Sequence, residues 1–279
     1  MPDNFEYCMG LLREGDRERY LTVLYSPESR RPGLAALFAF NLETSRIREI
    51  VSEPMPGEIR LQWWRDAISG DRAAEAMQHP VGAALQRAIT RYRLPQSALA
   101  NLLEARIFDL YNDPMPDQTS LEGYLGETVS VLFQLSAQIL MDGGDPGSSD
   151  AAGHAGVTFG LTGILRRTVF HRRYQQVFVP EEFLAAAGTD KETWLKGEDA
   201  EAAGRVVAMM TALARDHLTR AEMALAKLDP LVKPAFLPLA IVKPTLARIE
   251  RRPGRVSAGT AGLSPLTAQW RILRRAIGP

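Results

Sequence analysis

The sequence predicts an all-α protein that folds as one domain. Apolar residues recur at intervals of three and four along most of the 279 residues, which is the spacing of a buried stripe on a helix. Alternation of apolar and polar residues, the mark of a half-buried strand, is not found, and only residues 177–179 are ambiguous. The chain shows neither a repeat of fixed period nor a linker long enough to separate domains, so residues 1–279 are expected to form a single domain.

Eight helices are expected, separated by turns rich in proline, glycine and aspartate. They span residues 33–50, 59–68, 80–92, 95–111, 120–141, 151–170, 201–228 and 235–251. The helix at 59–68 is expected to begin after the breakers between residues 54 and 57. The stretches 129–140 and 157–165 are apolar on more than one side, which is typical of helices at the centre of a bundle. Residues 142–150 are the clearest loop.

Composition narrows the class of protein. The chain has 33 basic and 33 acidic residues and is 46% hydrophobic, which is typical of a globular protein and excludes a largely disordered one. A formal net charge of zero gives no overall attraction to nucleic acid, so no nucleic-acid partner is expected. Cys8 is the only cysteine, which excludes an internal disulfide and a cysteine-based zinc site. The four histidines are scattered, and we expect no metal site built on them.

The sequence gives no sign of a targeting or membrane-spanning segment. Its first twenty residues lack a basic region followed by an apolar core, so no signal peptide is expected. The most apolar stretch near the C-terminus, residues 235–242, is far shorter than the roughly 20 residues of a membrane span. These features predict a cytoplasmic protein and leave open a peripheral attachment to a membrane.

The sharpest local charge feature is the segment RRTVFHRR at residues 166–173. It contains no acid, and its candidate anion-binding residues are Arg166, Arg167, His171, Arg172 and Arg173. Guanidinium groups suit phosphate, diphosphate or carboxylate. The alternative is a basic helix end that complements the helix dipole. His171 is a poor general base in either case, because neighbouring arginines disfavour its protonated form.

Acidic pairs and tryptophans are the other candidates. Glu49 and Glu53 have the i, i+4 spacing that can chelate a divalent cation, but Glu53 precedes Pro54, which favours a solvated helix end. The adjacent Trp63 and Trp64 favour core packing, and a structural ion pair is enough to explain the neighbouring Asp66.

Six sequence motifs occur in a fixed order along the chain. They are LFAFN at 37–41, IRLQWWRD at 59–66, YLGETV at 124–129, GLTGILR at 160–166, VFVP at 177–180 and AFLPLAIV at 235–242. In this order they resemble the squalene/phytoene synthase family, and the resemblance covers nearly the whole chain. It implies a single all-α isoprenoid-synthase-like bundle around a central cavity, in agreement with the helices inferred above.

The resemblance also shows where this chain departs from the catalytic members of the family. Those enzymes join two prenyl diphosphates head to head, and two Asp-rich helical motifs bind magnesium and diphosphate. At the first motif this chain has Ser45, Arg46 and Glu49, and at the second it has Arg167 and then Phe170-His171. An arginine at the place of a metal ligand disfavours a metal cluster, and without metal the diphosphate would leave slowly. We therefore expect no cofactor.

Within the family, the pattern resembles the non-catalytic branch related to the mitochondrial assembly factor for respiratory complex I. The residues behind this resemblance are 39–41 (AFN) followed by the altered acidic motif, 51–53 (VSE) and the helix from Arg60 to Trp64. It implies a non-catalytic binding or assembly factor, in the cytoplasm or on the inner face of the cytoplasmic membrane. Its expected partners are a prenyl lipid or prenyl diphosphate and a complex I subunit.

Two alternatives stay open. One is an active head-to-head prenyltransferase that uses magnesium at an unorthodox site, with ligands drawn from Glu43, Glu49, Glu53 or Asp66. The other is a carrier or sensor of a prenyl lipid, which binds its ligand and does not convert it.

Overall fold

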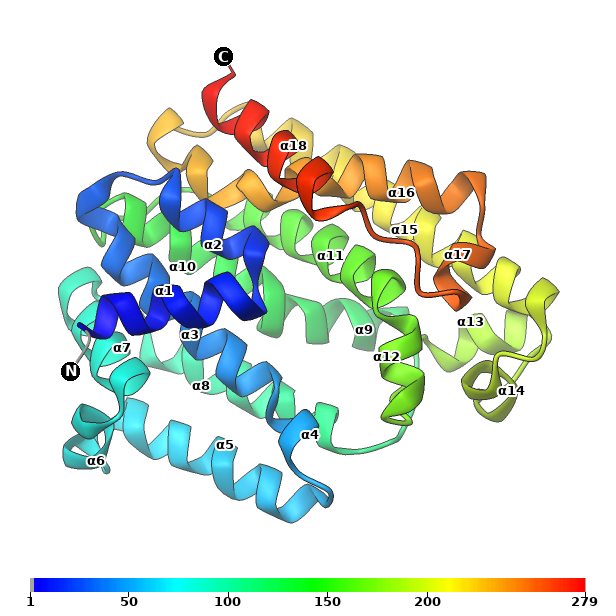
Figure 1. The fold of residues 1–279 in the computed structure, drawn as a ribbon, viewed down its shortest axis with the longest axis horizontal. Helices are drawn as coiled ribbons and strands as arrows, with labels where there is room; N and C mark the ends of the chain where they lie inside the picture. The colour runs from blue at the N-terminus through cyan, green and yellow to red at the C-terminus, as the bar shows by residue number, and fades with distance from the viewer. Residues whose placement is uncertain (1–2, 279) are drawn as a thin grey trace.

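Helix α11 (Ser149–Arg166) lies at the centre of the fold and packs along α15 (Ala200–Leu225), with the remaining helices around this pair (Figure 1). The computed structural model describes residues 3–278. Every regular element in that range is helical, and an isolated bridge between Met115 and Pro180 is the one β-type pairing there. The all-α prediction is confirmed, and the ambiguous residues 177–179 form a buried, non-helical segment.

The α-helices follow one another with short connections. Besides α11 and α15 they are α1 (Asn4–Gly15), α2 (Arg17–Leu24), α3 (Arg31–Ser45), α4 (Ile47–Ile50), α5 (Pro54–Ser69), α6 (Ala73–Gln78), α7 (Pro80–Tyr92), α8 (Gln96–Ala105), α9 (Gln118–Leu125), α10 (Val131–Leu140), α12 (Thr168–Arg173), α13 (Glu181–Ala186), α14 (Lys191–Lys196), α16 (Val242–Arg251), α17 (Gly254–Ser257) and α18 (Pro265–Ile277). The 3-10 segments are η1 (Glu28–Arg30), η2 (Arg106–Leu110) and η4 (Pro230–Ile241), and η3 (Gly126–Ser130) is a π-helical turn.

Two of the predicted helices are interrupted, and both interruptions lie beside the same pocket. The helix expected at 33–50 breaks at Arg46 into α3 and α4, and the helix expected at 151–170 breaks at Arg167 into α11 and α12. Hydroxyl groups of Thr44 and Thr168 donate hydrogen bonds to carbonyls of the preceding turn at these points. Such bonds compete with the backbone ladder and bend helices.

Prolines explain two other boundaries that differ from the predictions. Helix α5 begins at Pro54 and not at residue 59, because prolines in the first turn lack only an N–H that has no helical partner there. The segment before α16 is a 3-10 helix, since Pro234 and Pro238 interrupt α-helical hydrogen bonding. The helices α1, α2, α6, α13, α14, α17 and α18 were not expected.

No helix within residues 3–278 combines the length and the apolar character needed to cross a bilayer.

The close approach of α11 to η3 depends on glycine. A Cβ atom at Gly156 would overlap the backbone of Ser130, and one at Gly160 would overlap the side chain of Leu125. Ser130 also donates a hydrogen bond to the carbonyl of Gly153 at 2.8 Å. The buried face of α11 therefore sits directly against the π-helical turn.

Gly156→Ala is expected to lower the free energy of unfolding by roughly 1–3 kcal/mol or more, because backbone cannot yield as a flexible side chain does. The control is Gly153→Ala in the same helix, where a Cβ meets no atom within 4 Å and alanine gains up to about 1 kcal/mol of helix propensity. Urea denaturation of both variants measures the difference. Equal stability of the two would contradict the packing described.

Candidate functional site

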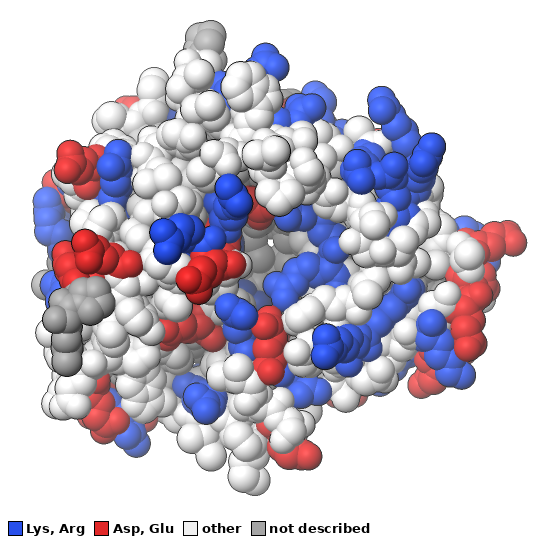
Figure 2. Space-filling model, in the orientation of Figure 1, with Lys and Arg blue, Asp and Glu red and all other residues white. Residues whose placement is uncertain are grey.

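A pocket of about 670 Å³ opens on the face shown in Figure 2, where a hollow near the middle is rimmed by both basic and acidic side chains. Its walls come from α1 and α2, from α3 and α4, from η2 and η3, and from α11, α12 and α18. Apolar side chains such as Leu125, Phe159 and Ile164 lie beside the charged ones. The lining of the pocket therefore combines apolar and charged side chains.

Arginines outnumber carboxylates along this lining by seven to five. Four of the carboxylates are each within 4.0 Å of an arginine. The separations are 2.6 Å for Asp16 and Arg19, 2.7 Å for Glu18 and Arg166, 3.2 Å for Glu49 with both Arg46 and Arg167, and 3.0 Å for Asp109 and Arg106. The lining thus has few carboxylates free to bind a cation and retains an excess of positive charge.

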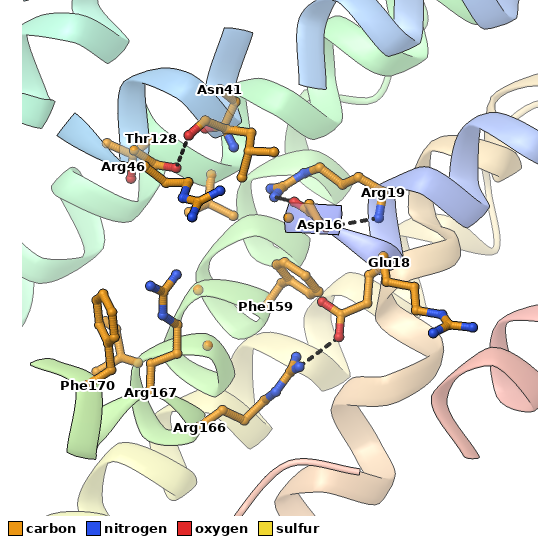
Figure 3. A pocket seen from close by; sticks show the side chains of 18 of the residues that line it. Asp16, Glu18, Arg19, Asn41, Arg46, Thr128, Phe159, Arg166, Arg167 and Phe170 are labelled. Atoms are coloured by element: carbon orange, nitrogen blue, oxygen red, sulfur yellow. Dashed lines mark hydrogen bonds and ion pairs between the residues drawn. The ribbon is translucent and has the colours of Figure 1, made fainter. Parts of the chain in front are cut away.

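Glu49 links the two segments that correspond to the Asp-rich motifs of the catalytic members, the one around Arg46 and the one around Arg167. Its Oε2 accepts from Nε of Arg46, and its Oε1 accepts from Nη2 of Arg167, each at 3.2 Å. Both arginines are about half exposed, and Arg167 stacks over the ring of Phe170 at 4.3 Å (Figure 3). Ser45 donates to the carbonyl of Leu42 and also lines the pocket. Because these charges remain in contact with water, the bridge contributes little stability and can yield to an incoming anion.

The residues present do not fit a magnesium cluster. Within the described range, 3–278, no group of three or more His, Cys, Asp or Glu residues is placed to hold a metal ion. The ligands considered for an unorthodox site are also dispersed. Glu43 lies 3.6 Å from His79 and outside the pocket, Glu53 is exposed before α5, and Asp66 pairs with Arg72 at 3.2 Å. These candidate ligands lie on different elements, with Glu43 on α3, Glu49 on α4 and Asp66 on α5, and only Glu49 lines the pocket.

The arginine-rich segment divides in two. Arg166, Arg167 and His171 line the pocket, whereas Arg172 and Arg173 do not. Arg166 is already paired with Glu18 from α2, and Arg172 stacks over Trp194 at 4.8 Å. Anion binding by the first three stays a prediction, and the structure does not bring the last two to the same place.

His171 is a neutral side chain in this setting. Burial, and then the charge of Arg167, lowers its pKa to about 3. Its ring packs against Phe178, with ring centroids 4.8 Å apart. His171 therefore adds no positive charge to the pocket at neutral pH and is not poised as a general base.

A buried polar network forms the floor of the pocket. Arg106 donates to Asp109 at 3.0 Å, to the hydroxyl of Tyr124 at 2.9 Å and to Asn41 at 3.2 Å. Tyr124 donates to the other oxygen of Asp109 at 2.6 Å, and Gln176 donates to the backbone carbonyl of Asp109. Burial raises the pKa of Tyr124, so its hydroxyl stays protonated and remains a donor.

Sequence inspection placed Asn41 and Tyr124 in motifs but gave no role to Arg106 or Asp109. Their i, i+3 spacing in η2 was the available signal. The other pocket residues that it missed, Asp16, Glu18 and Arg19, come from the unexpected helix α2 and its cap. Trp63 and Trp64 do pack as expected, with Trp64 buried against Phe40.

The fold and the pocket define an isoprenoid-synthase-like bundle whose acidic metal motifs are replaced. The chain belongs to the squalene/phytoene synthase family, which it matches over residues 12–273. Solved structures with the same fold include the squalene synthase HpnC from Alicyclobacillus acidocaldarius, with a TM-score of 0.75, 18% identity, and coverage of 89% of this chain and 94% of that one. A dehydrosqualene synthase in complex with ligand gives a TM-score of 0.77 with 13% identity, over 98% and 94%.

Curated relatives of higher identity have another name. The protein from Rattus norvegicus called NADH dehydrogenase (ubiquinone) complex I, assembly factor 6, is 30% identical over 251 residues, which cover 90% of this chain and 75% of the relative. The Homo sapiens protein of the same name is 29% identical over 88% and 73%. A Drosophila melanogaster homolog is 27% identical over 88% and 75%. The predicted family is confirmed, and so is the predicted likeness to the complex I assembly factor.

Stability is expected to fall as the pH drops below about 6.5, the ordinary pKa of histidine. The unfolded chain binds a proton at His171 from that pH downward, whereas the folded chain does so only near pH 3. Between these two pH values, His171 lowers the free energy of unfolding by roughly 1.4 kcal/mol for each pH unit of acidification. His171→Phe keeps an aromatic ring beside Phe178 and removes the titration. Urea denaturation between pH 7 and pH 5 should show a shallower loss for this variant, and an unchanged slope would contradict the assignment.

Proposed function

We propose that this protein is a non-catalytic assembly factor for respiratory complex I. Relatives that match about nine-tenths of this chain are named complex I assembly factor 6 in mammals, and their homologs in Drosophila and Dictyostelium have the same designation. The observation that carries the proposal is the contact of Glu49 with Arg46 and Arg167, at the two places where the catalytic members of the family gather aspartates.

The charge arrangement explains why catalysis is not expected. Departure of a diphosphate requires cations that neutralise its charge, and magnesium ions held by carboxylates supply them in enzymes of this type. Here Arg46 and Arg167 occupy the carboxylate positions, and Glu49 is held between them. The guanidinium groups can bind an anionic head group directly, but they repel the metal ions that would drive its ionisation.

A ligand-binding role is consistent with the same pocket. Its volume of about 670 Å³ lies within the range of small-molecule sites, and apolar side chains line it beside the arginines. We infer that a prenyl lipid or prenyl diphosphate binds there without being converted and without a metal cofactor. The protein would work on the cytoplasmic side of the membrane that holds its target complex.

Loss of the gene in the native host is expected to reduce the amount of fully assembled complex I. Native gels and NADH dehydrogenase activity of isolated membranes measure it, and the wild-type gene should restore both. A Glu49→Gln variant should also restore them, because the carboxylate has no catalytic task in this proposal. A normal amount of complex I in the deletion strain would contradict the proposal. So would a Glu49→Gln variant that folds normally but does not restore complex I where the wild-type gene does.

Farnesyl diphosphate is expected to bind saturably and to release no diphosphate when magnesium is added. Arg167→Glu should weaken binding about tenfold or more, because it replaces a charge-assisted donor by a repelling carboxylate. Arg173→Glu is the matched control, since Arg173 is exposed at the end of α12, the helix that follows Arg167, and lies outside the pocket lining. Titration calorimetry with and without a chelator measures the binding.

A coupled assay for diphosphate distinguishes this reading from the enzyme alternative. Turnover above background that falls in Glu49→Ala would show an active prenyltransferase and overturn the non-catalytic proposal. Equal weakening by Arg167→Glu and Arg173→Glu would show that general charge, not the pocket, attracts the ligand.

A further inference from the structure

A second hollow, of about 480 Å³, lies on the surface formed by α16, α17 and α18. Five arginines line it and no acidic side chain does: Arg248, Arg251, Arg252, Arg255 and Arg271. Figure 2 shows a dense group of basic side chains in the upper right of the view, over the ends of α16 and α17. We refer to these five residues and the hollow between them as the basic surface.

The charges of the basic surface are not balanced within the protein. In the part of the chain that the structure describes, no carboxylate lies within 4.0 Å of any of these five guanidinium groups. Glu250 is the one acid among residues 242–278, and it accepts two hydrogen bonds of 2.8 Å from Arg215 on α15. Desolvation, and then the charges of Arg248 and Arg252, lowers the pKa of Arg255.

Such a gathering of like charges disfavours the folded state unless an anion approaches it. By contrast, four of the five carboxylates of the central pocket are each paired with an arginine. The basic surface thus gathers five arginines that no carboxylate of the described chain pairs with, and an outside anion can neutralise them.

Helix α18 adds an apolar row beside these charges. Leu266, Trp270 and Ile277 are 78%, 58% and 73% exposed, and their spacings of four and seven residues place them along one line of the helix. Ile272 on the opposite side is fully buried and anchors the helix to η4. Arg271 and Arg274 are exposed next to the apolar row. Large apolar side chains in a row on the surface are typical of an interaction face.

We propose that the basic surface and the apolar row of α18 together bind a bilayer surface rich in anionic phospholipid. Helix α18 lies in the plane of the interface, with Trp270 and its two apolar neighbours among the upper acyl chains and the arginines on the lipid phosphates. The pairing of an apolar row with a basic row on one helix is the pattern of interfacial helices. A nucleic acid would be matched by the arginines alone and would leave the leucine, tryptophan and isoleucine exposed to water.

This placement has a consequence for the central pocket. Ala268, Gln269 and Ile272 of α18 line that pocket from the other side of the helix. Docking of α18 on a bilayer therefore places only this helix between the pocket and the lipid. The membrane proposal goes beyond the assembly function and does not depend on it.

Sedimentation with vesicles tests the electrostatic half of the proposal. The wild-type protein is expected to bind vesicles of equal parts phosphatidylcholine and phosphatidylglycerol, and to bind pure phosphatidylcholine far more weakly. Each basic charge near such a surface is worth roughly a fivefold change in partitioning. Arg251→Glu/Arg271→Glu should therefore lower partitioning by at least tenfold, and salt at about 1 M should have a similar effect, since the screening length is then about 3 Å.

The control for charge is Arg13→Glu/Arg60→Glu, which makes the same change of net charge at exposed residues of α1 and α5, away from this surface. It should bind as the wild type does. The apolar contact is tested with Leu266→Ser, which should weaken binding. Its control is Ile59→Ser, which changes an exposed side chain on α5 and should not weaken binding. In a variant with Trp63→Phe, fluorescence should shift to shorter wavelength on binding, because Trp270 is then the one exposed tryptophan while Trp64 and Trp194 are buried.

Four outcomes of the vesicle experiments would overturn the proposal. They are no binding of the wild type to anionic vesicles, equal loss in the two double variants, equal binding to neutral vesicles, or an unchanged Trp270 spectrum in the bound state. A purified acidic protein that binds this surface while anionic vesicles do not would identify a protein interface and would also overturn it. None of these readouts involves complex I, so failure here leaves the assembly proposal to its own test.

Discussion

The contact between α11 and the π-helical turn η3 is the constraint on which the site depends. Gly156 and Gly160 remove the side chains that would hold these elements apart, so α11 lies against the Ser130 backbone and Leu125. Gly160 and Gly163 then face the pocket. A Cβ at Gly163 meets no atom within 4 Å, which marks the open space beside the helix. The size of the pocket therefore depends on two features of α11. Gly156 and Gly160 let the helix approach η3 closely, and Gly163 leaves space beside the helix because it has no side chain.

Within that space, charge decides the chemistry. A bundle of this shape can bring two helices with carboxylates to a common metal cluster, but the same geometry here brings Arg46 and Arg167 to either side of Glu49. The polar floor of Arg106, Asp109 and Tyr124 is buried and largely paired, so it stabilises the pocket wall and presents donors to it. The fold shared with squalene synthases thus supports binding of an anion more readily than ionisation of one.

Helix α18 connects the two proposals physically. Its buried side closes the central pocket, and its outer side presents an exposed apolar row next to arginines. The zero net charge of the chain conceals this distribution, because the excess of basic residues near the C-terminus is offset by an excess of acids elsewhere. A protein with this arrangement can face a membrane with one surface while its other faces stay mixed in charge.

The sequence by itself determined the helical class, the family, and the replacement of acids by Ser45, Arg46 and Arg167, because periodicity and motif order are local properties. It did not reveal which charges meet. Arg166 and Glu18 are 148 residues apart, and Arg167 and Glu49 are 118 apart, so their contacts depend on how helices pack across the pocket. Local spacing likewise predicted one helix through Arg46 and one through Arg167, whereas side-chain hydroxyls at Thr44 and Thr168 bend both. Only the tertiary structure decided which arginines are neutralised and which remain for a ligand, since pairing requires distance in space and not in sequence.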